Sequence, residues 1–299
     1  MKSTQQPDLF GQVVDSLSDC TGMQRQGFFH EYRDSDPLPS ASVLKDIIDL
    51  CRAIFFPGFY GRNCISQSTL KYTMGVHVES LYNLLVKQIA AGLCFCTKTA
   101  EGESNDPFFA KAQDIASYII ESLPRLRKTL ETDVVAAFNG DPAATDYGEV
   151  ISCYPIIKTL INYRLAHELY MLHVPLIPRM LTEMAHSETG IDIHPGATIG
   201  DHFTVDHGTG VVIGATCIIG NNVKLYQGVT LGARSFPLDD QGHPIKGIPR
   251  HPILEDDVIV YSNATILGRI TIGKGAIVGG NLWVTEDVPA GTRVVQYRK

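Results

Sequence analysis

The chain has 299 residues, 44% of them hydrophobic, so it is long enough to bury a large core and is expected to form two domains. Its 25 basic and 32 acidic residues give a net charge of −7, and residues 191–299 carry nine basic and ten acidic side chains. This balance argues against the clustered basic surface that nucleic acids require, so no nucleic-acid partner is expected.

The sequence also argues against a membrane-spanning protein and against a disulfide-bonded secreted protein. No apolar run reaches the ~20 residues that cross a bilayer, and residues 1–7 lack the apolar segment of a signal peptide. The seven cysteines are an odd number without Cys-x-x-Cys spacing, which argues against a disulfide framework. We therefore expect a reduced, cytoplasmic protein with no membrane partner.

The N-terminal part, residues 1–188, is predicted to be an all-α domain. Residues 1–40 are polar and predict a loosely ordered start with one short helix. Beyond them, apolar residues at helical spacing, together with proline and Asn-Gly boundaries, predict further helices. These cover residues 42–55, 76–93, 106–120, 126–138 and 155–173, with a further turn reaching Met184.

Residues 189–299 show a different period. An Ile, Leu or Val returns every sixth residue, and glycine often follows it: Ile193, Ile199, Val205, Ile213, Ile219, Leu225, Leu231, Leu254, Val260, Ile266, Ile272, Val278 and Val284. A period of six fits neither an α-helix nor a simple strand alternation. It is typical of short parallel strands joined by tight corners, with the aliphatic side chain pointing inward. This pattern predicts a β-solenoid of hexapeptide repeats.

Two interruptions of this period mark candidate sites. The segment 206–210 holds two residues more than the repeat allows, and irregular strands often re-aim side chains at sites. Between Leu231 and Leu254 the repeat stops for 23 residues, which predicts one long projecting loop. Arg250-His251 stands where this loop rejoins the solenoid.

Four motifs together resemble the serine O-acetyltransferases of bacteria and plants. They are Asp192-Ile193-His194-Pro195-Gly196-Ala197 followed by Asp206-His207-Gly208-Thr209-Gly210, then Asp141-Pro142-Ala143-Ala144, Arg250-His251-Pro252 and Tyr163-Arg164-Leu165-Ala166-His167. The resemblance covers about residues 130–288. It implies a helical domain followed by a left-handed parallel β-helix, assembled as a homotrimer or hexamer. The implied reaction transfers the acetyl group of acetyl-CoA to the hydroxyl of L-serine, the first step of cysteine biosynthesis, without a metal.

Such a transfer needs a base for the hydroxyl proton, and the same group can then protonate the departing thiolate. Histidine suits both steps because its ordinary pKa lies near neutral pH. His207, at the irregular corner, is the candidate. Asp192 precedes it by fifteen residues, which predicts neighbouring coil levels about 4.8 Å apart, so this carboxylate could orient the imidazole. Without the resemblance, Asp206-His207 would be interpreted as an ordinary polar corner that faces water.

The resemblance also assigns the groups that bind serine. Asp141 and Asp206 would receive the amino group, Arg250 would pair with the carboxylate through two hydrogen bonds, and His251 would lie beside the carboxylate or hydroxyl. Asp141 has a structural alternative, because Asn139-Gly140-Asp141-Pro142 is also an ordinary helix end and turn.

Coenzyme A is expected along a groove between neighbouring solenoids, at positions that match Gly232, Ala233 and Ser262. L-cysteine is a possible feedback inhibitor by the same resemblance. The sequence ends in Val294-Val295-Gln296-Tyr297-Arg298-Lys299 instead of the family's longer tail with a terminal isoleucine, so a complex with cysteine synthase is not expected.

Three other functions fit parts of the pattern. His202 and His207 have a spacing that resembles the zinc site of hexapeptide-fold carbonic anhydrases, with His194, His243 or His251 as a third ligand across subunits. Stoichiometric zinc in the purified protein would favour that lyase. Acetyl transfer to another small hydroxyl acceptor, such as a sugar, and a purely structural solenoid are the remaining alternatives.

Overall fold

The computed structural model describes residues 9–30, 36–61, 65–97, 105–235 and 237–296. The chain divides into two units, Met1–Asp36 and Pro37–Lys299. The first unit contains two short helices, α1 (Leu9–Ser18) and α2 (Thr21–Gln26), whose side chains are not buried. The sequence predicted one short helix in this stretch, and α2 is additional.

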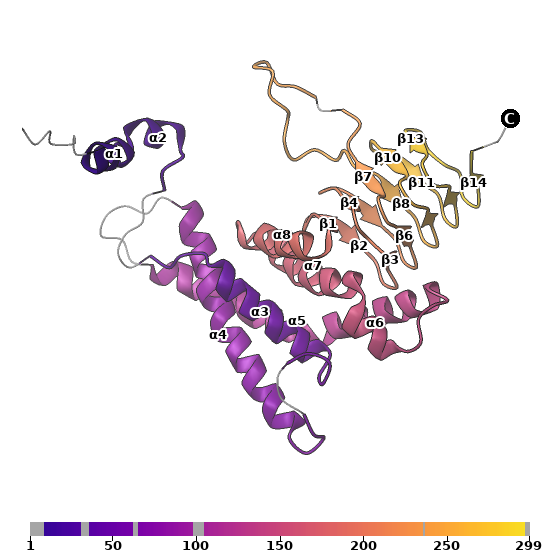
Figure 1. The fold of residues 1–299 in the computed structure, drawn as a ribbon, viewed down its shortest axis with the longest axis horizontal. Coiled ribbons are helices and arrows are strands. Elements are labelled where there is room, and N and C mark those ends of the chain that lie inside the picture. Colours follow the sequence, from indigo (N-terminus) through magenta and orange to yellow (C-terminus); the bar gives the residue numbers. More distant parts are fainter. Residues whose placement is uncertain (1–8, 31–35, 62–64, 98–104, 236, 297–299) are drawn as a thin grey trace, which may run out of the picture. The chain divides into compact units, whose positions relative to one another are not determined.

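The second unit begins with six further helices, seen in Figure 1 as the purple to salmon part of the ribbon. They are α3 (Ala41–Phe55), α4 (Leu70–Cys96), α5 (Asp106–Gly140), α6 (Tyr147–Cys153), α7 (Pro155–Met171) and α8 (Ile177–Thr189). The helix predicted over residues 42–55 is confirmed: the Ser40 side chain caps α3 by accepting a hydrogen bond from the Val43 N–H. Among the helices of the described residues, none is long and apolar enough to cross a bilayer.

The prediction of two helices over 106–120 and 126–138 is wrong. One helix, α5, runs through both, with Pro124 in its interior. Proline removes one helical hydrogen bond and crowds the preceding turn. However, the buried stripe continues on both sides of it, through Ile119 and Leu123 to Leu126 and Leu130, so tertiary packing outweighs this local cost.

Helix α6 was not predicted, although its N-terminus has a recognisable signal. The Asp146 carboxylate accepts a hydrogen bond from the Glu149 N–H at 2.9 Å, and the Glu149 carboxylate accepts one from the Thr145 N–H at 2.8 Å. An acidic N-cap followed three residues later by Glu is a variant of the capping box.

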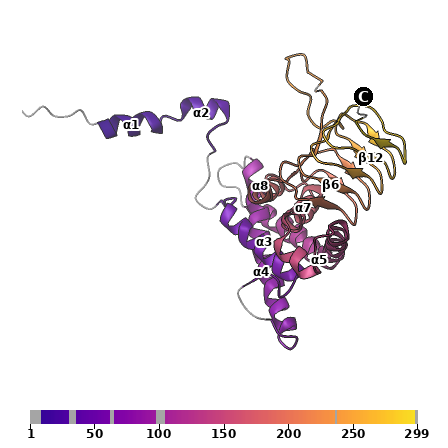
Figure 2. The ribbon, with the colours of Figure 1, turned by 45° about the vertical axis from the view of Figure 1, so that its right-hand side comes forward.

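The remainder of the chain winds into a parallel β-solenoid with three sheets (Figures 1 and 2). The first sheet contains β1 (Asp192–Ile193), β4 (Val212–Ile213), β7 (Thr230–Gly232), β10 (Thr265–Leu267) and β13 (Trp283–Val284). The second contains β2 (Thr198–Ile199), β5 (Ile218–Ile219), β8 (Ile253–Leu254) and β11 (Thr271–Ile272). The third contains β3 (Thr204–Asp206), β6 (Lys224–Tyr226), β9 (Ile259–Val260), β12 (Ile277–Val278) and β14 (Arg293–Val294). All thirteen aliphatic residues that defined the six-residue period are buried.

Strand register confirms both predicted interruptions. Val212 pairs with Thr230, eighteen residues later, which is one turn of three hexapeptides. Asp192 pairs with Val212, twenty residues later, so the first turn has the two extra residues expected at 206–210. Thr230 pairs with Thr265 across the long loop, which projects from the solenoid in Figure 1.

Helix α7 attaches the solenoid to the helices. The Tyr163 hydroxyl donates to the Ala197 carbonyl at 2.6 Å, and His167 Nδ1 lies 2.8 Å from the Pro195 carbonyl oxygen. Arg164 forms an ion pair with the fully buried Asp133 of α5 at 3.0 Å. The predicted helical region followed by a parallel β-helix is therefore confirmed, while the boundary at 188/189 stays a prediction.

Candidate active site

The predicted site residues lie along two edges of the solenoid. The first edge consists of the corners that lead from the third sheet into the first: residues 207–211, 227–229 and 261–264. The second edge consists of the corners that lead from the first sheet into the second: residues 194–197, 214–217 and 233–252. The first sheet lies between these edges.

His207 stands on the first edge, directly after β3. Its backbone is left-handed, with φ 58°, and its side chain is 76% exposed. The same left-handed backbone recurs at other non-glycine corners of the solenoid, including Asn222 and Asn263, so it belongs to the corner geometry of the fold. Nε2 of His207 lies 3.9 Å from Oδ1 of Asp206. The corner thus presents an imidazole to any molecule that approaches this edge.

The structure brings Asp141 to the same place. Asp141 follows α5, and its carboxylate accepts hydrogen bonds from the Tyr154 hydroxyl and, at 2.8 Å, from the Ala143 N–H. These bonds, followed by the nearby positive charge of Lys224, lower the pKa of Asp141. The same contact raises the pKa of Tyr154 to about 12. Asp141 therefore both ends the helix and keeps an ionised carboxylate within electrostatic range of His207.

Asp141 and Asp206, the predicted ammonium ligands, line one small cavity of about 10 Å³ together with Tyr154 and Lys224. Sequence analysis missed Lys224, because an isolated lysine on a solenoid usually faces water. Its position in the repeat is the signal that could have found it. Lys224 pairs in register with Thr204, which stands two residues before Asp206 on the neighbouring strand.

Asp192 begins β1, at the end of this strand that faces the first edge. Its carboxylate, however, forms an ion pair with Arg179 of α8 at 3.3 Å. Within the described part of the chain, no hydrogen bond or ion pair joins Asp192 to His207. Arg179 also pairs with Glu183, whose other oxygen lies 3.2 Å from Nδ1 of His186. Arg179 was not singled out from the sequence.

Arg250 and His251 lie on the second edge. The backbone N–H groups of both residues donate to the Thr216 hydroxyl, at 2.9 and 3.1 Å. The His251 ring packs so closely on Gly214 that a Cβ there would lie 2.1 Å from its Cδ2. Burial, reinforced by the positive charge of Arg250, lowers the pKa of His251 to about 4. This imidazole is therefore neutral near pH 7 and suited to hydrogen bonding.

The predicted coenzyme A positions are divided between the edges. Gly232 ends β7 on the second edge, where its carbonyl accepts from the Gly268 N–H at 3.0 Å, and Ala233 opens the long loop. Ser262 lies on the first edge, and its carbonyl accepts from the Asn281 N–H at 2.9 Å. In a single chain, these residues therefore border the first sheet from both sides.

The histidines of the zinc alternative are not gathered in one chain. His202 and His207 lie beyond opposite ends of β3, at different corners. Among the described residues, the group whose potential ligand atoms lie within 4.8 Å of one another is Glu183, His186 and Asp192. The guanidinium of Arg179 already pairs with both of these carboxylates and opposes a cation there.

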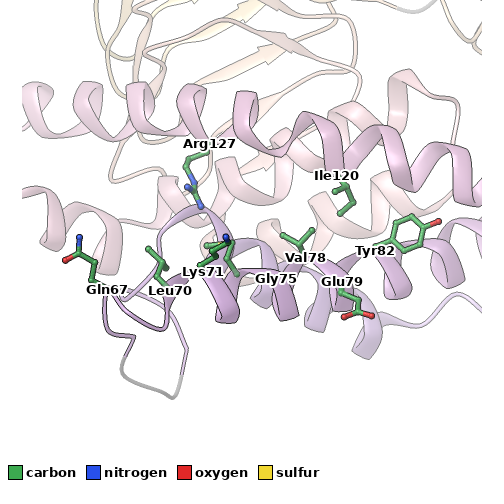
Figure 3. Close-up of a pocket in the computed structure, with 10 residues that line it drawn as sticks. Gln67, Leu70, Lys71, Gly75, Val78, Glu79, Tyr82, Ile120 and Arg127 are labelled. Atoms are coloured by element: carbon green, nitrogen blue, oxygen red, sulfur yellow. The ribbon is translucent and has the colours of Figure 1, made fainter.

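A larger groove, of about 740 Å³, lies away from the solenoid between α4 and α5. Figure 3 shows its wall, which includes Leu70, Val78, Tyr82, Ile120 and Arg127. It contains none of the residues that the sequence singled out.

Comparison with known proteins gives consistent results. No protein-family model matches the chain. A plasmid-encoded serine acetyltransferase of Synechococcus elongatus is 47% identical over 262 residues, which cover 87% of this chain and 82% of the relative.

Among solved structures, serine acetyltransferase 1 of Entamoeba histolytica in complex with L-cysteine superposes with a TM-score of 0.73 at 34% identity, covering 89% of this chain and 91% of that chain. Soybean serine acetyltransferase complexed with serine gives a TM-score of 0.54 at 29% identity, covering 87% and 98%. The solenoid matches the left-handed β-helix of these enzymes, as predicted.

Proposed function

The chain belongs to the serine acetyltransferase family, and we propose that it transfers the acetyl group of acetyl-CoA to the hydroxyl of L-serine. The observation that carries this proposal is the convergence of Asp141, Asp206 and His207 at the first edge, from segments far apart in sequence. Two carboxylates beside an exposed imidazole suit an acceptor with an ammonium group and a nearby hydroxyl.

In the proposed reaction, His207 removes the proton of the serine hydroxyl while its oxygen attacks the thioester carbonyl of acetyl-CoA. The tetrahedral intermediate collapses as the C–S bond breaks, and the imidazolium returns the proton to the departing thiolate. The products are O-acetyl-L-serine and CoA, the former for use in cysteine biosynthesis. Such proton transfer contributes about 10²–10⁴-fold to the rate.

Asp192 is proposed to hold the His207 ring during this cycle, as in other histidine–carboxylate pairs. Both residues lie at the first edge, and Asp192 is also paired with Arg179.

Arg250 is proposed to bind the serine carboxylate through two charge-assisted hydrogen bonds, with neutral His251 beside it. Because these residues lie on the second edge, we propose that the complete site forms between protomers of a trimer, which can pair into a hexamer. Rotation about a three-fold axis would set one protomer's first edge against its neighbour's second edge. Coenzyme A would occupy the groove between them, along Gly232, Ala233 and Ser262.

L-cysteine carries the same ammonium and carboxylate groups as serine. Since the Entamoeba enzyme was crystallised with L-cysteine, we propose that cysteine binds this chain at the serine site and inhibits it. A cytoplasmic location is part of the proposal and agrees with the six free cysteines of the described residues.

The test is release of free thiol from acetyl-CoA with L-serine, L-homoserine and simple sugars as acceptors. We expect L-serine to give by far the highest kcat/KM, and L-cysteine to compete with it. Preference for a sugar, or turnover that depends on stoichiometric zinc, would refute the proposal.

A further inference from the structure

Lys224 occupies a place that the proposed reaction does not explain. It lies on β6, half-buried, and its ammonium donates a hydrogen bond to the Gly140 carbonyl at 2.6 Å. The same Nζ lies 3.6 Å from Oδ2 of Asp206 and 4.4 Å from the centre of the Tyr226 ring. One side chain therefore connects the end of α5, the end of β3 and an aromatic face.

The fit between Lys224 and Gly140 is close. A Cβ at Gly140 would lie 3.3 Å from the lysine Nζ and 3.5 Å from its Cε. The lysine stem thus rests against the backbone that immediately precedes Asp141. Because Gly140 and Lys224 are 84 residues apart, this bond fixes the helical part on the solenoid at the proposed ammonium site.

The Lys224 ammonium competes with a substrate ammonium for the same carboxylates, so its presence in the site needs an explanation. The charges supply one. Asp141 and Asp206 carry two negative charges on one small cavity, and Lys224 offsets one of them. Binding of a single substrate ammonium would then balance the remaining charge of these two carboxylates, so that neither is left without a cation.

We propose that Lys224 is a positioning and specificity residue of the amino-group subsite. By tying Gly140 to Asp206 it fixes Asp141 and Asp206 on either side of the substrate ammonium. It acts through these residues and takes no part in the proton transfer. This inference rests on the proposed function and adds to it a residue that sets selectivity for a singly charged α-amino group.

The test compares the full-length Lys224→Met variant with the wild type. Methionine keeps the apolar stem and removes the charge. We expect the apparent KM for L-serine to rise about tenfold, the factor for one lost charge-assisted hydrogen bond, with kcat and the acetyl-CoA KM within twofold. Lys224→Arg should recover most of the loss, because its guanidinium can reach both partners.

Two serine analogues locate the effect. Ethanolamine keeps the ammonium and lacks the carboxylate, so its KM should rise as that of serine does. 3-Hydroxypropanoate lacks the ammonium, so its kcat/KM should be the same in both proteins. Lys158→Met, which removes another half-buried ion-paired lysine 2.9 Å from Glu188, is the matched control and should change none of these values.

An unchanged serine KM in Lys224→Met would overturn the inference, and so would an equal loss with 3-hydroxypropanoate, which would indicate general damage. If the wild-type protein itself failed to acetylate L-serine, the proposed function would fall and this inference with it. An active wild type with an insensitive variant overturns only the role of Lys224.

Discussion

His207 combines two properties that suit a proton-transferring residue at an open corner. Its side chain is exposed, and the Asp206 carboxylate lies 3.9 Å from its Nε2. Because the side chain supports no core packing, its removal should leave the fold intact. Loss of activity in a His207 variant would therefore report on the reaction and not on the stability of the fold.

We predict that His207→Ala lowers kcat/KM for L-serine by about 10²–10⁴-fold, the usual contribution of general acid–base catalysis. Steady-state thiol release measures the loss. Size-exclusion chromatography should give the wild-type oligomer. Near-normal turnover in this variant would refute the assignment of the base.

Arg250→Ala should act on binding. Loss of a guanidinium that holds a carboxylate through two bonds is expected to raise the serine KM by about 10- to 100-fold, with the acetyl-CoA KM little changed. Arg293→Ala, which alters an exposed arginine on the last strand, is a suitable control. Equal increases in both KM values would contradict a carboxylate-binding role.

His251 should make the folded state sensitive to mild acid. Its pKa is lowered to about 4 in the fold, whereas an unfolded histidine takes up a proton near pH 6.5. Between these values the unfolded state binds more protons, so stability falls as the pH drops from about 6.5 to 4. The difference between the urea midpoints at pH 7.5 and pH 5.0 should be smaller in the His251→Gln variant than in the wild type. Identical pH dependence would contradict the burial-lowered pKa.

At the scale of elements, helix α7 decides how the two parts of the second unit fit together. Arg164 pairs with buried Asp133 on α5 and donates to the carbonyls of Ile199 and Gly200 at 2.7 and 2.8 Å. The same Asp133 accepts from the Phe203 N–H at 3.0 Å. Two helices and the first solenoid turn therefore share one polar network, which Arg164 of the Tyr163-to-His167 motif forms together with Asp133 of α5.

Arg164→Met should destabilise the protein by about 3–5 kcal/mol, because it leaves the carboxylate of Asp133 buried without its cation. Urea unfolding measures the change. Arg125→Met breaks an ion pair of similar length, 2.9 Å to Glu168, but Arg125 is 57% exposed. That variant should lose no more than about 1 kcal/mol. Equal losses would mean that burial does not set the cost.

At the scale of the whole molecule, the main feature is that the proposed site residues are divided between two edges of the solenoid. Residues proposed for proton transfer and ammonium binding lie on the first edge, and those proposed for the serine carboxylate lie on the second. A solenoid is too rigid to bring its own edges together, because its inward aliphatic residues form a continuous packed core. A symmetric ring of protomers joins unlike edges without deforming either.

This arrangement predicts complementation between inactive subunits. His207→Ala and Arg250→Ala proteins, unfolded together and refolded as mixed trimers, should recover about a quarter of wild-type activity, because each mixed ring of three contains one intact site. Each variant refolded alone is the control and should stay inactive. Failure of mixed rings to recover activity would place both residues in the same protomer's site.

The sequence by itself determined the solenoid, the inward residues and both interruptions. A six-residue period and its breaks are local properties, and each turn repeats the same local geometry. It also singled out Asp141, Asp206, His207, Arg250 and His251 through their motifs. It failed at Pro124, where a continuous buried stripe outweighs the local preference of proline to end a helix.

Only the tertiary structure decided which of these residues meet. The edge on which each side chain stands depends on how the strands pair across the two insertions. A local sequence pattern does not show this pairing. The Lys224–Gly140 bond joins residues 84 positions apart, and the Asp192–Arg179 pair depends on how α8 packs on the first turn. Such contacts follow from the packing of whole elements, so no short stretch of sequence could predict them.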